Sequence, residues 1–149
     1  MKLVIGSDHG GFTAKEFAKK WLQKAGHDVT DFGCYSPDAV DYPDVAQLVG
    51  EAVIARQFDK GVLIDGFGGA VCLAANKIPG VRAVAAYNSV SARFATAHDD
   101  ANVLCLGGKT HGELALAEML QVFFATSYKG GRHDGRLAKI AGIERKYNK

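Results

Sequence analysis

The stretch VLIDGFGGAVCLAANK, residues Val62 to Lys77, decides the fold because it holds a strand, a glycine loop and a helix in direct succession. Its first letters are continuously apolar, which is typical of a strand buried on both faces of a sheet. Asp65 follows this run, and three glycines occupy positions 66, 68 and 69. This order predicts one β–α unit of a parallel sheet, with a carboxylate at the mouth of the connecting loop.

The rest of the chain repeats this alternation of short apolar runs and longer amphipathic segments. We expect strands at residues 2–6, 27–33, 60–65, 81–87 and 102–108, and helices at residues 12–25, 43–53, 89–97, 113–126 and 137–147, with a further helix after the glycine loop. Five β–α units in succession predict an α/β fold, a Rossmann-like three-layer α/β/α sandwich with a five-stranded parallel sheet in the order 2-1-3-4-5. A chain of 149 residues fits a single domain spanning residues 1–149.

Such sheets bind ligands beyond the carboxyl ends of the strands, where the strand order reverses. In the order 2-1-3-4-5 this crevice lies between the first and third strands. The loops that follow these strands read GSDHGG, from residue 6, and DGFGGA, from residue 65. Both loops are rich in glycine and carry acidic or imidazole groups, so we expect a binding site between them.

The loop from Asp65 to Ala70 suits a negatively charged oxygen. Glycines let backbone N–H groups point inward, and the start of a helix adds unpaired N–H groups. The pocket fits a phosphate or an oxyanion that forms during a reaction. The loop lacks the Lys-Ser/Thr pair of a P-loop and the spacing of a dinucleotide fingerprint. The alternative is a tight strand-to-helix turn without function.

Other charged groups follow the predicted strands or the chain's late glycines. Asp8 could accept a hydrogen bond from a hydroxyl-rich ligand and His9 could donate one to it, although Asp8 could equally cap a helix. Arg132 and Arg136, spaced by one helical turn, suit a phosphate dianion, or else form a solvated basic turn. His98 ends a predicted helix, a position where a lone histidine is often structural.

Composition excludes several other classes of protein. The formal net charge of +2 is too small to indicate nucleic-acid binding, and no apolar run is long enough to span a membrane. The three cysteines lack CxxC spacing and the five histidines lack HxH or HExxH spacing, so we expect reduced thiols and no metal site. The N-terminus reads as a strand and not as a signal peptide, which favours a cytoplasmic protein.

Five motifs, taken in order, resemble the ribose-5-phosphate isomerase B / galactose-6-phosphate isomerase family. They read GSDHGG, VDYPD, AANKIPGVRA, HDDANVLCLGG and GGRHDGR, and the resemblance runs from Met1 to about Ile143. It implies a five-stranded α/β/α fold, no cofactor, and aldose–ketose interconversion of a phosphorylated sugar. It also implies a homodimer or a tetramer whose active sites are completed by residues from two chains.

The resemblance also assigns roles by position. It implies that Asp8, His9 and Tyr42 line the sugar site, that His98 is the acid that opens the sugar ring, and that Arg132 and Arg136 hold the phosphate. The anion-hole loop of the family falls on Gly66, Phe67, Gly68, Gly69 and Ala70, and the remaining substrate-binding positions fall on Asp99 and Lys109.

The sequence departs from the family pattern at the loop itself. The family usually reads CGTGxG there, with cysteine as the base, whereas this chain has Asp65, then Phe67 for threonine and Ala70 for glycine. Three further positions differ, with Asp99 for asparagine, Lys109 for arginine and Cys72 for serine. The loop most resembles the A subunit of heteromeric galactose-6-phosphate isomerase, which also lacks the cysteine.

These departures leave several hypotheses open. Asp65 is either the base that takes the proton next to the carbonyl, as a glutamate does in triosephosphate isomerase, or only a cap of the following helix. Cys72, further along that helix, is a weaker candidate for the base. The chain is accordingly expected to be a sugar-phosphate isomerase acting on a pentose, hexose or tetrose phosphate. The alternatives are a non-catalytic subunit and a sugar-phosphate-binding protein without turnover.

Overall fold

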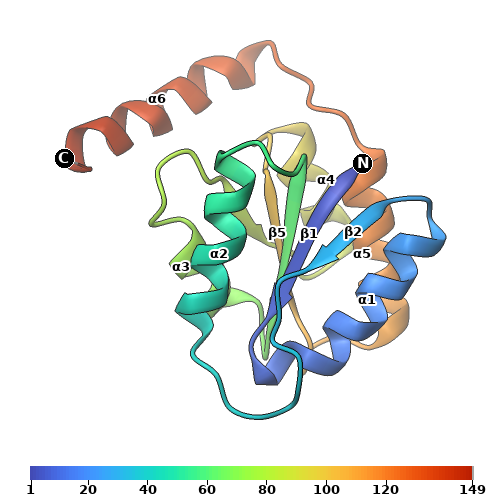
Figure 1. The fold of residues 1–149 in the computed structure, drawn as a ribbon. Helices are drawn as coiled ribbons and strands as arrows, with labels where there is room; N and C mark the ends of the chain where they lie inside the picture. Colours follow the sequence, from blue (N-terminus) through green and yellow to red (C-terminus); the bar gives the residue numbers. More distant parts are fainter. Residues whose placement is uncertain (149) are drawn as a thin grey trace.

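The computed structural model describes residues 1–148 and contains one sheet with helices around it (Figure 1). The strands are β1 (Lys2–Ser7), β2 (Asp28–Asp31), β3 (Lys60–Asp65), β4 (Ala83–Ala85) and β5 (Val103–Gly107). The helices are the 3-10 turn η1 (His9–Gly11), α1 (Phe12–Lys24), α2 (Tyr42–Ile54), α3 (Gly69–Ala75), α4 (Ser89–Ala97), α5 (Glu113–Ala125) and α6 (Arg132–Tyr147). The predicted α/β class is confirmed.

All strand pairs are parallel, but the predicted strand order is wrong at one edge. The order is β2-β1-β3-β5-β4, so β5 and not β4 pairs with β3. The physical reason is burial, because every residue of β5 is buried whereas β4 has only three residues, two of them partly exposed. The predicted adjacency of β1 and β3 is confirmed, and β5 becomes a third strand whose carboxyl end reaches the same place.

Two apolar cores lie on the two faces of the sheet. On one face α1, α4 and α5 pack around Leu120 and Phe123, which are fully buried. On the other face α2 and α3 pack around Val49 and Leu63. Because both faces are covered, the central strands are apolar throughout, as the run after Lys60 predicts.

Local signals set several of the helix ends. Pro43 lies in the first turn of α2, where its missing N–H costs nothing. Asn88 and Ser91 form a reciprocal capping box at the start of α4, and the observed helix matches the predicted range of residues 89–97. The predicted strands at residues 27–33 and 81–87 are shorter in the structure, as β2 and β4.

Helix α6 begins at Arg132, five residues before the predicted start at Leu137. It belongs to neither face of the sheet and lies across the end where the strands begin (Figure 1). Its contact with the body includes a 2.8 Å hydrogen bond from the Gly80 N–H to Glu144. None of the helices within residues 1–148 combines the length and the apolar character needed to cross a membrane.

Candidate active site

The loops that follow β1 and β3 lie against each other at the carboxyl end of the sheet. The Asp8 N–H donates to the Ile64 carbonyl at 3.3 Å, which joins the end of β1 to the end of β3. A Cβ atom on Gly10 would come within 3.3 Å of the Gly66 nitrogen, so the two loops are in close contact. The two loops therefore lie next to each other, as the predicted adjacency of the first and third strands implies, and they form two walls of the candidate site.

The loop after β5 forms a third wall. Its Gly108 N–H donates to the Asp65 carbonyl at 2.7 Å, and its Lys109 N–H donates to the Gly66 carbonyl at 2.9 Å. The aliphatic stem of Lys109 lies over Gly66, since a Cβ there would be 3.6 Å from the Lys109 Cδ. Lys109 thus brings a cation to the glycine loop within the same chain.

Asp65 lies at the centre of these walls and is only 2% exposed. Its Oδ1 accepts a hydrogen bond from the Gly68 N–H. Gly68 has a φ of +91°, and a Cβ there would lie 3.1 Å from the carbonyl carbon of Leu106, so this turn requires glycine. Within residues 1–148 no hydrogen bond reaches Oδ2 and no buried side-chain oxygen lacks a partner, so Oδ2 keeps contact with solvent.

Phe67 presents an apolar surface at the top of the glycine loop. Its side chain is 64% exposed, and its ring lies so close to Gly69 that a Cβ there would be 2.8 Å from the ring Cζ. Gly107 of β5 packs beneath the Phe67 backbone, where a Cβ would come within 2.7 Å of its Cα. Gly69 therefore makes room for the phenyl ring, and Gly107 makes room for the backbone that carries it.

The acidic and imidazole groups after β1 are held by their own backbone and by the next loop. Asp8 caps η1 by accepting from the Gly11 N–H at 3.1 Å. Nδ1 of His9 lies 3.2 Å from the Val40 nitrogen and 3.3 Å from the Val40 carbonyl oxygen, so the backbone of Val40 holds the ring on this side. Tyr42 begins α2 and is 36% exposed. These three residues lie at the carboxyl end of the sheet, the end at which β3 reaches Asp65.

His98 lies at the opposite end of the molecule. It ends α4, where its N–H donates to the Phe94 carbonyl at 2.9 Å, and β5 then begins at Val103. Its ring stacks on the ring of Phe94, with 4.5 Å between the ring centroids, and on the ring of His133 in α6, with 4.3 Å between the centroids. Burial, followed by the positive charge of His98 and of the α6 arginines, lowers the pKa of His133.

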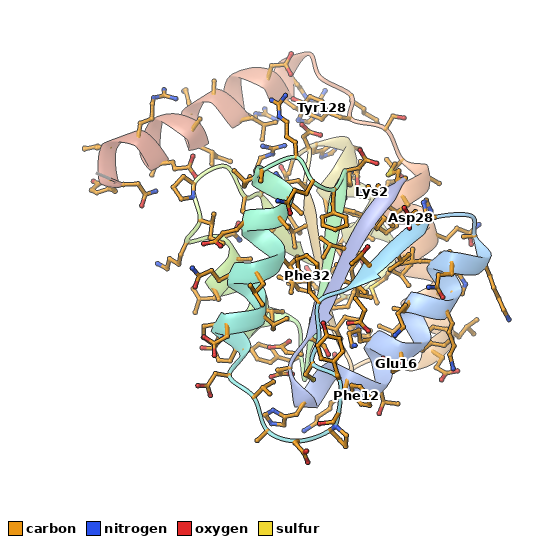
Figure 2. The ribbon with its side chains drawn as sticks, in the orientation of Figure 1. Lys2, Phe12, Glu16, Asp28, Phe32 and Tyr128 are labelled. Atoms are coloured by element: carbon orange, nitrogen blue, oxygen red, sulfur yellow. The ribbon has the colours of Figure 1, made fainter. Side chains whose placement is uncertain are left out.

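The two arginines share this opposite end. Arg132 and Arg136 are exposed in the first turns of α6, one turn apart. Asp99 lines a groove of about 570 Å³ between α6 and the body, together with Ile140. Figure 2 shows the two ends of the molecule. Tyr128 lies at the end where α6 begins, and Phe12, the first residue of α1, lies at the opposite end.

The structure thus divides the predicted site residues into two groups. Asp8, His9, Tyr42, residues 65–70 and Lys109 gather at the carboxyl end of the sheet, whereas His98, Asp99, Arg132 and Arg136 gather at the amino end. At about 3.3 Å per residue, the length of β5 alone separates the two groups by more than about 10 Å. One chain therefore cannot bring both groups to one small sugar.

Sequence reasoning missed two side chains beside the glycine loop. The Thr110 hydroxyl lies 2.9 Å from Nδ1 of His111, and the other ring nitrogen of His111 donates to the Tyr87 carbonyl at 3.0 Å. These bonds tie the turn that carries Lys109 to the loop after β4. The stretch GGKTHG after a strand could have indicated them, because polar residues there lie at the ligand-binding edge.

Two thiols lie beneath the same loop. A hydrogen bond with Cys105 lowers the pKa of Cys72 to about 7 despite burial, while burial raises the pKa of Cys105 well above its usual range. The Cys72 thiol donates to the Ala83 carbonyl at 3.4 Å. In residues 1–148 no three His, Cys, Asp or Glu side chains gather as metal ligands.

Known proteins share this fold over their whole length. The ribose-5-phosphate isomerase B of Escherichia coli K12 is 38% identical over 148 residues, covering 99% of both chains. The solved structure of Clostridium thermocellum ribose-5-phosphate isomerase B matches with a TM-score of 0.98 and 42% identity, covering 99% of this chain and 100% of that one. A Mycoplasma genitalium ribose-5-phosphate isomerase B, solved with bound ribulose-5-phosphate, matches with a TM-score of 0.93 and 38% identity, covering 97% and 96%.

A family model described as Ribose/Galactose Isomerase matches residues 3–140. This range includes both groups of site residues and most of α6. The chain belongs to the ribose/galactose isomerase family.

Proposed function

We propose that this chain is a single-domain aldose–ketose isomerase of a phosphorylated sugar, working through an enediol and without a cofactor. Its family, and relatives that are named for ribose 5-phosphate, support this reaction. The substrate is ribose 5-phosphate or a related pentose, hexose or tetrose phosphate. A sugar phosphate dianion does not cross membranes unaided, which supports a cytoplasmic location.

The observation that carries the proposal is the state of the Asp65 carboxylate. One oxygen is held by the Gly68 N–H, whereas within residues 1–148 no hydrogen bond occupies the other. A base needs this combination, because the fixed oxygen orients the carboxylate and the open oxygen can take a proton. In the reaction, Asp65 removes the proton from the carbon next to the aldehyde and returns it to the former aldehyde carbon, while the hydroxyl proton of the second carbon moves to the former aldehyde oxygen.

The glycine loop would stabilise the charge that develops on the carbonyl oxygen. The N–H groups of Gly69 and Ala70 open α3 and have no acceptor within the helix. N–H groups fixed before the reaction stabilise an enediolate without reorganising, which is the main advantage of such a loop. The Phe67 ring would exclude water from one side of Asp65 and favour a substrate with few hydroxyls there.

The second group of residues would come from a partner chain. His98 would open the sugar ring, Arg132 and Arg136 would hold the phosphate, and Asp99 would contact a hydroxyl. In a homodimer, alone or within a tetramer, the amino end of one chain would face the carboxyl end of the other. Exposed apolar side chains on α4 and α6 support such an interface, namely Val90, Phe94, Ile140, Ile143 and Tyr147.

The first test is incubation of the pure protein with a panel of sugar phosphates in heavy water. We expect deuterium at the carbon next to the carbonyl, read by NMR, for at least one substrate. Product without deuterium would contradict an exchangeable enediol. Binding of every sugar phosphate without exchange or product would instead indicate the non-catalytic alternative, in which Asp65 only holds Gly68 and another subunit supplies the base.

A second test addresses the shared site. The variants D65N and H98N should each be inactive, but mixing them after partial unfolding should restore about a quarter of wild-type activity, because half of the dimers then carry one intact site. No recovery, with mixed dimers demonstrated by a mass tag, would show that both residues act within one chain.

A further inference from the structure

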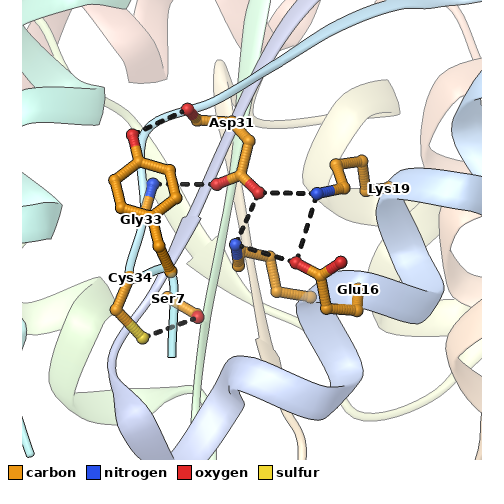
Figure 3. Close-up of polar contacts among 8 residues, drawn as sticks. Ser7, Glu16, Lys19, Asp31, Gly33 and Cys34 are labelled. Carbon is orange, nitrogen blue, oxygen red and sulfur yellow. Dashed lines mark hydrogen bonds and ion pairs between the residues drawn. The ribbon is translucent and has the colours of Figure 1, made fainter. Parts of the chain in front are cut away.

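Lys15 is a buried cation that the proposed reaction does not use. It lies on α1 with its side chain 0% exposed, and its Nζ is 2.6 Å from Oδ2 of Asp31 and 3.2 Å from Oε1 of Glu16. Figure 3 labels both of these acidic partners, together with Lys19. Placing an ammonium group inside a protein costs several kcal/mol unless it is paired and hydrogen-bonded. An apolar side chain of similar volume would fill the same space, so filling space does not account for the charge.

The Asp31 carboxylate uses both of its oxygens. Oδ2 accepts from Lys15 and, at 2.8 Å, from Lys19, while Oδ1 accepts from the Gly33 N–H at 2.8 Å. Burial alone would raise the pKa of Asp31, but the hydrogen bonds from Lys15, Lys19 and Gly33 outweigh it and lower the pKa. Asp31 therefore stays ionised and fixes the backbone that follows β2.

That backbone is in turn bonded to the last residue of β1. The Ser7 N–H donates to the Gly33 carbonyl at 2.7 Å, and the Cys34 N–H donates to the Ser7 carbonyl at 2.7 Å. Ser7 is completely buried, and both of its backbone groups are held by this one segment. Asp8, which we place in the sugar site, is the next residue, so the segment after β2 sets the position from which the Asp8 side chain starts.

We propose that Lys15 is a positioning residue for Asp8, acting through Asp31 and through the pairing of Gly33 and Cys34 with Ser7. The inference rests on the proposed function, in which Asp8 contacts the sugar. A hydrogen bond to a hydroxyl weakens steeply when its geometry shifts, so a support that is fixed at both ends matters for binding. The buried ion pair of Lys15 and Asp31 supplies that support, because Lys15 has a fixed place on α1 and therefore fixes the place of the Asp31 carboxylate.

The test compares K15M with K19M. Both variants remove one cation from the same Asp31 oxygen, but Lys19 is 23% exposed and lies at the edge of the cluster. With ribose 5-phosphate as the probe, K15M should raise KM about tenfold and leave kcat within about twofold, the pattern of lost uniform binding. K19M should change both constants less than about twofold.

A double-mutant cycle separates positioning from general damage. If Lys15 acts through Asp8, then D8N should raise KM by a similar factor, and D8N/K15M should be no worse than D8N alone. Full additivity of the two changes, or a lower melting temperature of K15M with an unchanged KM, would overturn the proposal. If K15M does not fold, D31N takes its place in the cycle with the same expected pattern.

Amide hydrogen exchange distinguishes failure of this proposal from failure of the proposed function. K15M should speed exchange at the Ser7 and Cys34 amides at least about tenfold while leaving the amides of β5 protected. Unchanged exchange at Ser7 and Cys34 would refute the positioning role directly. An unchanged KM in D8N, with the faster exchange present in K15M, would instead refute the role of Asp8 in the sugar site.

Discussion

Replacing Asp65 by asparagine separates its observed hydrogen bond to the glycine loop from its proposed role as the base. The amide oxygen of asparagine can still accept the hydrogen bond from the Gly68 N–H, so the loop keeps its shape. The amide of this variant cannot act as a base, so the variant cannot remove the substrate proton. Alanine at the same position would remove both the hydrogen bond and the group that takes the proton. The Gly68 N–H would then be buried without a partner, which costs about 1–3 kcal/mol of folding free energy.

The magnitudes follow from these contacts. A positioned general base contributes about 10²–10⁴ in rate, or about 3–5 kcal/mol of barrier. D65N should therefore slow exchange and turnover at least about a hundredfold, while its melting temperature stays within about 3 °C of the wild type. D65A should be equally inactive but melt several degrees lower, because the Gly68 N–H is unsatisfied.

The assay is deuterium incorporation from heavy water into the substrate, read by NMR over the sugar-phosphate panel, with melting followed in parallel. The intact mass must be checked, because an asparagine that precedes Gly66 deamidates to aspartate and would restore the base. Exchange by D65N at the wild-type rate, with the mass confirmed, would refute Asp65 as the base and leave it only its bond to the loop.

Three further predictions follow from the two ends of the molecule. R132A should weaken binding of phosphorylated sugars at least about tenfold more than binding of free sugars, measured by calorimetry, because its guanidinium pairs with the dianion; equal losses would contradict a phosphate site. Cys72 should react with iodoacetamide with a midpoint near pH 7 while Cys105 stays unmodified in the folded chain, read by peptide mass spectrometry; a midpoint near that of a free thiol would refute the Cys105 hydrogen bond. Because the pKa of His133 is lowered on folding, the folded state prefers the neutral ring, and this stability is present above the ordinary pKa of 6.5 and lost as the pH falls below it. The melting temperature of the wild type should accordingly drop more steeply between about pH 7.5 and about pH 5 than that of H133F, which keeps the stacked ring without its titration, and parallel slopes would refute this.

Sequence patterns correctly predicted those helices and strands whose ends are determined by a few neighbouring residues. β3 runs from Lys60 to Asp65 as expected, because an apolar run ends abruptly at a glycine. Helix α4 matches its predicted range because Asn88 supplies the cap. Both signals act over a few residues, and the packing around them agrees with them.

The order of the last two strands could not be predicted in the same way. The segments that contain β4 and β5 are both apolar, and parallel strands joined through helices carry no turn that specifies a neighbour. The strand that is buried on both faces takes the central position in the sheet. This burial is established only when all the helices have packed on the sheet. The start of α6 was misjudged because Gly135 reads as a breaker, although an exposed helix tolerates it at a cost of about 1 kcal/mol.

For the site, the sequence supplied the side chains but not their distances. Gly66 and Lys109 are far apart in the chain, and they meet only because β5 lies beside β3. The stacking of His98 on His133 depends on how α6 folds back, which no local pattern encodes. These site roles remain predictions, and the variants described above test them.

The place of β5 in the sheet also has a consequence for biosynthesis. Gly61 pairs with Val103, so the middle of the sheet stays open until the residues of β5 have been synthesised. Until then β3 presents a bare apolar edge to other nascent chains, and β4 has no neighbour to pair with. Ribosome-stalled chains that end before Val103 should therefore aggregate or recruit chaperones, whereas chains that extend through α5 should resist proteolysis.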